Sequence, residues 1–146
     1  RKTVRDGGAV AKSLLAQVDE VVQKLAEAQS VDFIAIARSL RDGSSALASV
    51  VDYMVEHAKG DPRAVYAGSV TYLKLAGIVL GGWQMARAAI VAQDKLDAGE
   101  GDAAFYRAKI ATARFYADHI LSQAQGLRHA ITEGAAGVLA LDVEQF

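Results

Sequence analysis

The chain contains no cysteine, and a single proline stands among its 146 residues. Without cysteine, disulfide bonds, thiolate metal sites and a cysteine nucleophile are all excluded, and a reducing compartment is permitted. We therefore expect a cytoplasmic protein. The scarcity of proline, together with a hydrophobic share of 52%, suits long packed helices and argues against both disorder and a turn-rich β protein.

A strong charge of one sign is missing as well. The formal net charge is -1, and acidic and basic residues are interspersed along the chain. No basic stripe is available to neutralise a phosphate backbone, so nucleic acid is not an expected partner. The longest apolar run, residues 75–92, is interrupted by Gln84 and Arg87. We interpret it as a buried helix of a soluble protein, with no membrane as partner.

Hydrophobic spacing predicts two long helices in the first part of the chain. One spans about residues 9–29, and the next spans about residues 32–59, beginning at Asp32, whose carboxylate can accept hydrogen bonds from free first-turn amides. Gly43 could bend or divide this second helix, although the apolar spacing continues through it. The apolar positions three or four apart in the first helix are Val10, Leu14, Val18, Val21, Leu25 and Ala28.

Two further helices follow the clearest punctuation in the sequence, Gly60-Asp61-Pro62. Gly60 can end a helix, Asp61 can cap the next one, and Pro62 suits the first helical position, where a backbone N–H is not needed. The third helix is predicted over about residues 62–98 and the fourth over about residues 102–133. Between them, Gly99-Glu100-Gly101-Asp102 forms a turn, with Asp102 as the cap of the fourth helix.

Four amphipathic helices joined by short turns predict an all-α fold, an up-and-down four-helix bundle with a short C-terminal tail. A chain of 146 residues has room for one domain with one sizeable core. The sequence has no fixed-period repeat, no low-complexity tract and no internal linker. We therefore expect residues 1–146 to form a single helical bundle domain.

Metal and haem sites are not expected in this bundle. Di-iron centres of helical bundles use Glu-x-x-His pairs that project inward. None of the three histidines, His57, His119 and His129, has a carboxylate three residues before it. A Cys-x-x-Cys-His haem motif is impossible without cysteine. We interpret the histidines as surface residues or members of polar networks.

Three glycines interrupt the third predicted helix, Gly77, Gly81 and Gly82, and Trp83 follows them directly. No strand precedes them, so they do not form a phosphate-binding loop. A glycine inside a helix costs about 1 kcal/mol relative to alanine, which the close approach of another helix would offset. These four residues are the candidate packing or interface site. The approaching helix could belong to the same bundle or to a second subunit, with Trp83 as a large anchor.

Three arginines allow two interpretations. Arg87, Arg107 and Arg114 could clamp an anionic ligand such as a CoA phosphate, because guanidinium groups match phosphate oxygens in geometry. Solvated helix faces and intersubunit ion pairs explain the same residues equally well and are commoner.

Several segments together carry a family resemblance: Tyr72-Leu73, Gly82-Trp83, residues 105–116 and the ending from Gly134 to Phe146. In order and spacing they resemble the accessory C-terminal domain of bacterial acyl-CoA dehydrogenases, in the subgroup that includes the 3-methylmercaptopropionyl-CoA dehydrogenase-like enzymes. The resemblance covers nearly the whole chain. It is distributed over four helices and includes no catalytic motif.

The resemblance implies a parent flavoenzyme that needs FAD and dehydrogenates acyl-CoA thioesters at the α and β carbons. In such enzymes a glutamate removes the α-proton and the β-hydrogen leaves as hydride to the flavin. That glutamate lies before a junction that Arg1-Lys2 with Asp6-Gly7-Gly8 resembles, and therefore outside this chain. We assign no catalytic, cofactor-binding or metal-binding residue here. Glu133 echoes the catalytic Glu-Gly motif, but it follows a complete four-helix pattern, and we interpret it as an exposed helix-end residue.

Two functions follow from these observations. In the first, the chain is the non-catalytic C-terminal domain of an FAD-dependent acyl-CoA dehydrogenase. It would support the catalytic domains of the same polypeptide and the association of subunits into a homo-oligomer, with acyl-CoA as the substrate of the parent enzyme. In the alternative, the chain is a free-standing helical protein–protein interaction module that binds through the face of Gly77 and Trp83. A reading frame that extends upstream into a flavoenzyme favours the first function, and a start codon at Arg1 favours the second.

Overall fold

The chain folds into helices joined by short turns, as a computed structural model describes it for residues 2–145. Arg1 and Phe146, the ends of the predicted 1–146 domain, lie outside the described residues, as does part of the junction-like segment. No strand occurs between residues 2 and 145. The prediction of an all-α fold is therefore confirmed.

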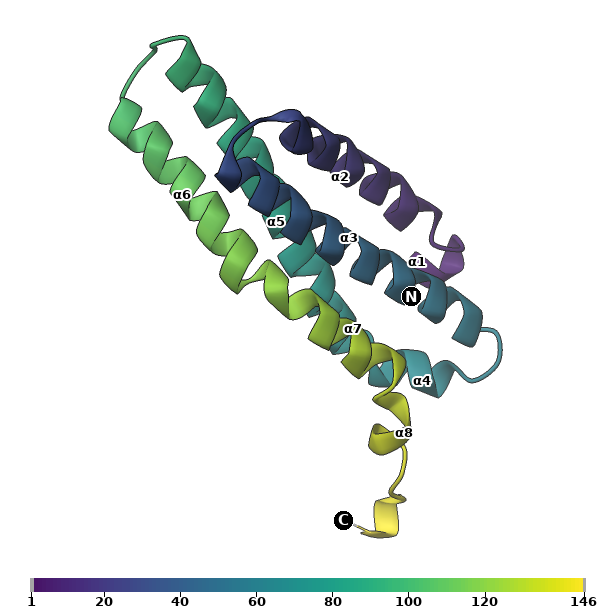
Figure 1. The fold of residues 1–146 in the computed structure, drawn as a ribbon. Helices are drawn as coiled ribbons and strands as arrows, with labels where there is room; N and C mark the ends of the chain where they lie inside the picture. The colour runs from purple at the N-terminus through teal and green to yellow at the C-terminus, as the bar shows by residue number, and fades with distance from the viewer. Residues whose placement is uncertain (1, 146) are drawn as a thin grey trace.

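The long helices α2, α3 and α5 lie beside one another and beside the succession of α6, η1 and α7 (Figure 1). Helices α2 and α3 pack as one antiparallel pair, and α5 and α6 pack as another. In chain order the helices are α1 (Lys2–Arg5), α2 (Ala9–Glu27), α3 (Val31–His57), α4 (Pro62–Ala67), α5 (Ser69–Asp97), α6 (Ala103–His119), the 3₁₀ helix η1 (Leu121–Gln123), α7 (Ala124–Thr132), α8 (Ala135–Val138) and the 3₁₀ helix η2 (Val143–Gln145).

Two of the predicted helices are divided, which corrects the picture of four uninterrupted rods. The third predicted helix breaks at Gly68, between α4 and α5, where a side-chain Cβ would lie 2.9 Å from Cγ2 of Ile131. The fourth breaks at Ile120, after which Leu121–Gln123 tighten into η1. The three-or-four spacing of apolar residues runs through both breaks, so periodicity alone could not locate them.

The residues that begin and end the helices were predicted better than the breaks inside them. Asp61 accepts a hydrogen bond from the Arg63 amide at 3.0 Å, and Asp102 accepts one from the Ala104 amide at 2.8 Å, so both predicted caps are confirmed. The predicted Asp32 cap is wrong. Helix α3 begins one residue earlier, and the Asp32 carboxylate pairs with Arg114 of α6 instead.

Helix α3 lies at the centre of the core and contacts α2, α5, α6 and α7. It continues unbroken through Gly43, which is buried, and a Cβ at this position would lie 3.2 Å from Cδ2 of Leu121. The largest fully buried side chains are Leu25, Ile36, Leu40, Leu75 and Ile131. The core therefore joins the two helix pairs into one body.

The first predicted stripe is confirmed at Val18 and Leu25, which are fully buried, and needs correction elsewhere. Leu15 and Val22 are buried, whereas their neighbours Leu14 and Val21 are half-buried, and Val10 is 72% exposed. Paired apolar residues such as Leu14-Leu15 fit two helix registers equally well, because neighbours differ by only about 100° around the axis. Packing against α3 selects the register.

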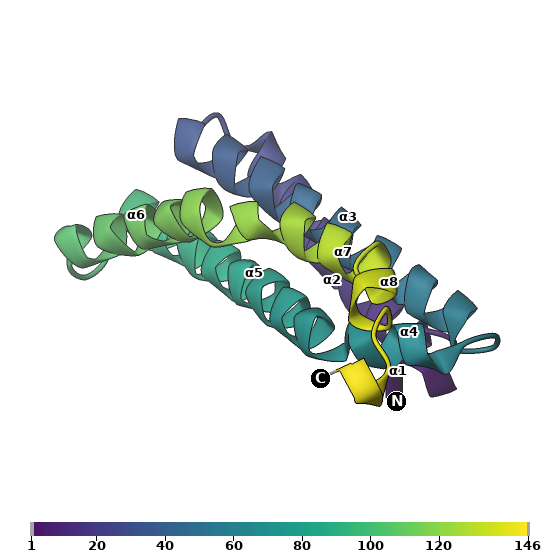
Figure 2. The same cartoon turned by 90° about the horizontal axis from the view of Figure 1, so that it is seen from below.

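The short helices α1, α4 and α8 gather at one end of the molecule (Figure 2). Helix α8 packs against α4, and the segment beyond it, with η2, stands away from the four rods (Figure 1). The end of α8 and this C-terminal segment expose the apolar side chains of Val138, Leu139, Leu141 and Val143.

Candidate functional site

Helix α5 is apolar on two opposite sides. Its inner side packs into the core through Leu75 and Val79, which are fully buried. Its outer side exposes Val70, Leu73 and Val91, at 79%, 72% and 57% of their surface. Sequence analysis predicted a buried helix here, and the structure corrects this for the outer side. A helix that is apolar all round is normally covered on all sides.

By length and composition, α5 is long and apolar enough to cross a membrane, and 39% of its most apolar 18 residues are buried inside the fold. Core helices of soluble proteins can be equally long and apolar. Along its inner side α5 packs into the fold through contacts with α2, α3, α6 and α7.

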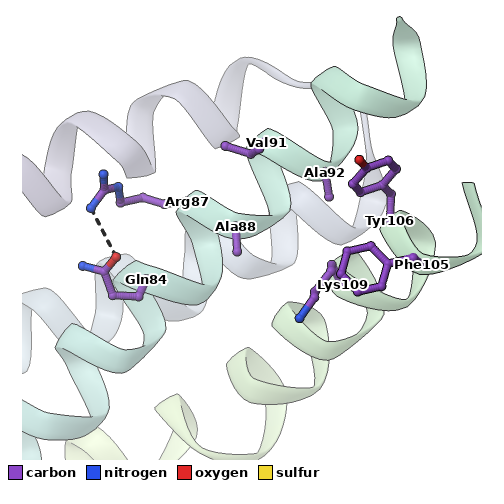
Figure 3. A pocket seen from close by; sticks show the side chains of 8 residues that line it. All are labelled: Gln84, Arg87, Ala88, Val91, Ala92, Phe105, Tyr106 and Lys109. Atoms are coloured by element: carbon purple, nitrogen blue, oxygen red, sulfur yellow. Dashed lines mark hydrogen bonds between the residues drawn. The ribbon is translucent and has the colours of Figure 1, made fainter. Parts of the chain in front are cut away.

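An open groove lies between the outer side of α5 and the beginning of α6 (Figure 3). Its lining residues are Gln84, Arg87, Ala88, Val91, Ala92, Phe105, Tyr106 and Lys109. The lining contains no carboxylate, histidine, serine or threonine, so the groove offers neither an acid–base pair at neutral pH nor an alcohol nucleophile.

Two cations and an exposed aromatic ring give the groove its chemical character. Arg87 donates a hydrogen bond to Oε1 of Gln84 at 3.2 Å and lies 5.2 Å from the centre of the Trp83 ring. The Lys109 ammonium lies 5.0 Å from the centre of the Phe105 ring (Figure 3). Neither Arg87 nor Lys109 forms an ion pair within residues 2–145. The groove is therefore suited to binding an apolar surface that carries negative charge.

The glycines of the candidate packing or interface site lie in two different environments. At Gly82 a Cβ would lie 2.7 Å from Cδ1 of Leu121, and at Gly81 it would collide with the Tyr116 hydroxyl. Both glycines allow α6 and η1 to approach the α5 backbone closely. At Gly77 nothing lies within 4 Å of a Cβ, so this glycine belongs to the open outer side.

Trp83 lies at the edge of the core and is half-buried. Its indole Nε1 is buried and has no hydrogen-bond partner within residues 2–145. Arg87 covers part of its ring. The ring thus connects the core to the groove on the outer side of α5.

Tyr116 provides a pH-dependent measure of the contact between α5 and α6. Its hydroxyl donates a hydrogen bond to the Ile78 carbonyl at 3.1 Å, and burial raises the pKa of this phenol above the usual 10.0. Because the pKa is higher in the folded state, the stabilisation is complete below the unfolded-state pKa and is lost as pH rises through the folded-state pKa.

We expect Tyr116→Phe to weaken the loss of stability above pH 10. Removing the hydrogen bond should also lower the free energy of unfolding at neutral pH by about 0.5–1.5 kcal/mol. Denaturant unfolding at neutral and alkaline pH measures both effects. Tyr66→Phe is the matched control, because Tyr66 is 71% exposed. Equal alkaline sensitivity of wild type and Tyr116→Phe would contradict the assignment.

The three arginines do not converge on one ligand. Arg114 donates to Asp118 at 2.7 Å and to Asp32 at 3.0 Å, and the Asp118 hydrogen bond raises the pKa of this guanidinium. Arg107 lines a separate groove that it shares with Asp32. Only Arg87 faces the groove of Figure 3. The alternative of a phosphate clamp built from all three has no common site in this fold.

The histidines lie apart from one another. His57 stacks on Tyr53 with ring centres 4.0 Å apart, and its Nδ1 lies 2.9 Å from the Tyr53 carbonyl oxygen. His119 lies against Phe115, and His129 is exposed on α7. Within residues 2–145, no three histidine, cysteine, aspartate or glutamate side chains are grouped so that they could hold a metal ion.

Glu133 directly follows α7, and its side chain is exposed. Its backbone N–H donates to the His129 carbonyl at 2.9 Å, as expected of a residue that ends a helix.

The outer apolar residues of α5 were missed by sequence reasoning, although a pattern for them exists. Val70, Leu73, Gly77, Gln84 and Val91 recur at intervals of three, four, seven and seven residues, which places them on one side of the helix, offset from the buried positions. A helix with one apolar stripe toward the core and a second on its outer side has little polar surface left. This shortage of polar surface could have indicated that the outer side of α5 also makes a contact.

The chain is similar to known proteins over nearly its full length. The sequence model of the family described as "Acetyl-CoA dehydrogenase C-terminal like" matches residues 14–142. Over 139 residues the chain is 34% identical to 3-methylmercaptopropionyl-CoA dehydrogenase of Ruegeria pomeroyi. The aligned region covers 95% of this chain and 23% of that protein. Over 153 residues the chain is 31% identical to a broad-specificity linear acyl-CoA dehydrogenase of Mycobacterium tuberculosis. The aligned region covers 100% of this chain and 25% of that protein. The chain thus spans about a quarter of the length of these curated relatives.

Proposed function

The chain belongs to the acetyl-CoA dehydrogenase C-terminal-like family, and we propose that it is the non-catalytic helical domain of a larger FAD-dependent acyl-CoA dehydrogenase. In this role it packs against the catalytic domains of the same polypeptide and supports subunit association in a cytoplasmic homo-oligomer. The proposal rests on how much of this chain, and how much of each relative, is matched. The relatives match 95% and 100% of this chain, but this chain covers only 23% and 25% of them.

The proposal treats residues 1–146 as one domain that behaves as an up-and-down four-helix bundle. Helices α4 and α5 together form its third rod, and α6, η1 and α7 form its fourth. The shared core around α3 supports this view, because each helix pair buries its apolar side against the other.

The residues present do not fit FAD. Binding this cofactor requires donors for its two phosphates and a deep slot for the isoalloxazine ring. The groove of Figure 3 is open and offers no deep slot for the ring. We therefore assign FAD, the acyl-CoA substrate and the catalytic base to the part of the parent enzyme outside this chain.

Mixing the purified chain with FAD is expected to leave the visible spectrum of the flavin unchanged, and an added acyl-CoA should not bleach it. The expectation follows because the groove described within residues 2–145 is open and no catalytic base is assigned in this chain. The visible absorption bands of the flavin, recorded with increasing protein concentration and then with added acyl-CoA, measure binding and bleaching. Stoichiometric flavin binding or bleaching by substrate would contradict the non-catalytic role.

The exposed outer side of α5 is the observation that favours the alternative, a free-standing interaction module. The sequence of the gene upstream of the Arg1 codon separates the two functions. A continuous reading frame encoding a flavoenzyme supports the proposed function, and a start codon at this position supports the module.

A further inference from the structure

One outer surface of the molecule combines exposed apolar side chains with positive charge. It comprises the outward side of α5 and the beginning of α6, and we call it the α5–α6 face. Its members are Val70, Leu73, Lys74, Gly77, Arg87, Val91, Phe105 and Lys109. Phe105 is 52% exposed and borders the same groove as Val91, so the apolar surface continues from one helix to the next (Figure 3).

The charges on the α5–α6 face have a single sign. Neither residues 69–93 of α5 nor residues 103–117 of α6 include an aspartate or glutamate, and carboxylates lie just beyond these ranges, at Asp94 near the end of α5 and at Asp102 before α6. The cations Lys74, Arg87 and Lys109 form no ion pair within residues 2–145. Three cations that surround exposed valine, leucine and phenylalanine complement an apolar surface bordered by carboxylates.

The outer side of α2 has the opposite character. It exposes carboxylates and cations together, including Asp19, Glu20 and Lys24, and Val10 is its one large exposed hydrophobic residue within the described α2. Such a mixed polar surface is typical of a face that meets water. Of these two sides, the contrast therefore favours the α5–α6 face as the covered one.

A second copy of the chain fits the α5–α6 face poorly. A two-fold contact of this face with itself would bring cations against cations without any carboxylate between them. A contact with the α2 side of another copy would be head-to-tail and open-ended, and would leave Val70 and Leu73 facing a mostly polar surface.

We propose that the α5–α6 face is the surface on which the rest of the same dehydrogenase polypeptide packs, through an apolar patch bordered by aspartate or glutamate side chains. This inference rests on the proposed function and adds the surface and its chemistry. Curated relatives about four times as long as this chain have the additional polypeptide that such a contact requires. Gly77, with open space around it, is where the partner backbone approaches most closely.

Cysteine labelling tests the proposal, because the chain has no cysteine of its own. Val70→Cys and Val10→Cys form a matched pair, both valines in helices and 79% and 72% exposed. Each is labelled with a maleimide in the 146-residue chain and in the full-length polypeptide, and the rate is read from the labelled peptide by mass spectrometry. We expect Val70→Cys to react about ten-fold more slowly in the full-length protein, because a covered side chain reacts only after local opening. Val10→Cys should react equally fast in both.

The charge part of the proposal has its own test. In full-length protein carrying Val70→Cys, adding Lys74→Glu and Arg87→Glu should restore fast labelling, whereas adding Lys24→Glu on the α2 side should not. Two results would overturn the assignment of a carboxylate-bordered partner. In the first, labelling becomes fast only when Lys24→Glu is added. In the second, labelling stays slow in all variants.

Three other results would overturn the proposal. Equal labelling of Val70→Cys in both proteins means that the face is open, and slow labelling of the isolated chain that speeds up on dilution means that a second copy covers it. Protection that appears only with vesicles of anionic phospholipid means that a membrane covers it. The proposed function fails separately, if the reading frame upstream encodes no flavoenzyme. It survives if Val10→Cys is protected instead, since the domain then packs through its α2 side.

Discussion

Leu75→Ala is expected to lower the free energy of unfolding of the chain by about 2–5 kcal/mol. Leu75 is 0% exposed, on the inner side of α5, where the helix packs into the core shared by both helix pairs. Truncation removes buried methyl and methylene groups and leaves a cavity that close-packed neighbours fill only in part. A loss of this size is a large fraction of the stability of a domain, about 5–15 kcal/mol.

Leu73→Ala is the control for this prediction. Leu73 belongs to the same helix and lies two residues away, but it is 72% exposed. We expect its truncation to change the free energy of unfolding by less than about 0.5 kcal/mol. Urea unfolding followed by circular dichroism measures both variants. Similar losses for the two would mean that α5 has a different rotation about its axis, and the division into inner and outer sides would have to be abandoned.

Gly82→Leu is expected to lower the free energy of unfolding by about 1–3 kcal/mol, because it overpacks the contact between α5 and η1. A Cβ at this position would already lie within 2.9 Å of Cγ and both Cδ atoms of Leu121. The branch point of Leu121 cannot rotate away as the end of a flexible side chain could. The added side chain must therefore move η1 or displace Leu121 from the core.

Gly77→Leu is the matched control, since a Cβ at Gly77 meets nothing within 4 Å. Here the gain in helix propensity of up to about 1 kcal/mol is unopposed, and the isolated chain should become more stable. In the full-length polypeptide the same substitution should destabilise the protein if the α5–α6 face is covered. Thermal unfolding of both forms measures this reversal, and stabilisation in both would contradict a close approach at Gly77.

The helix caps show which structural features residues close in sequence can determine. Asp61 and Asp102 cap the helices that follow them, as predicted, because a cap depends on a side chain and an amide two or three residues away. Asp32 has the same local chemistry, but its carboxylate binds Arg114, which is 82 residues away in sequence. A partner at that distance competes with the local cap, and no pattern of neighbouring residues reveals it.

The family resemblance was also readable from the chain alone, and the match over residues 14–142 confirms it. It depends on the order of residue types along the sequence, which needs no coordinates. The breaks at Gly68 and Ile120 were not predicted, since the close approach of Gly68 to Ile131 exists only once α4 and α7 have met.

The sequence by itself determined an all-helical chain, the ends of most helices and the family, because these depend on composition, short-range hydrogen bonding and residue order. Tertiary structure alone decided what the glycines do. Gly82 lies under Leu121 and Gly77 lies on open surface, although both are glycines of one helix five residues apart. Packing decides which side of α5 meets the core, and a helix apolar on both sides contains no local information about that choice.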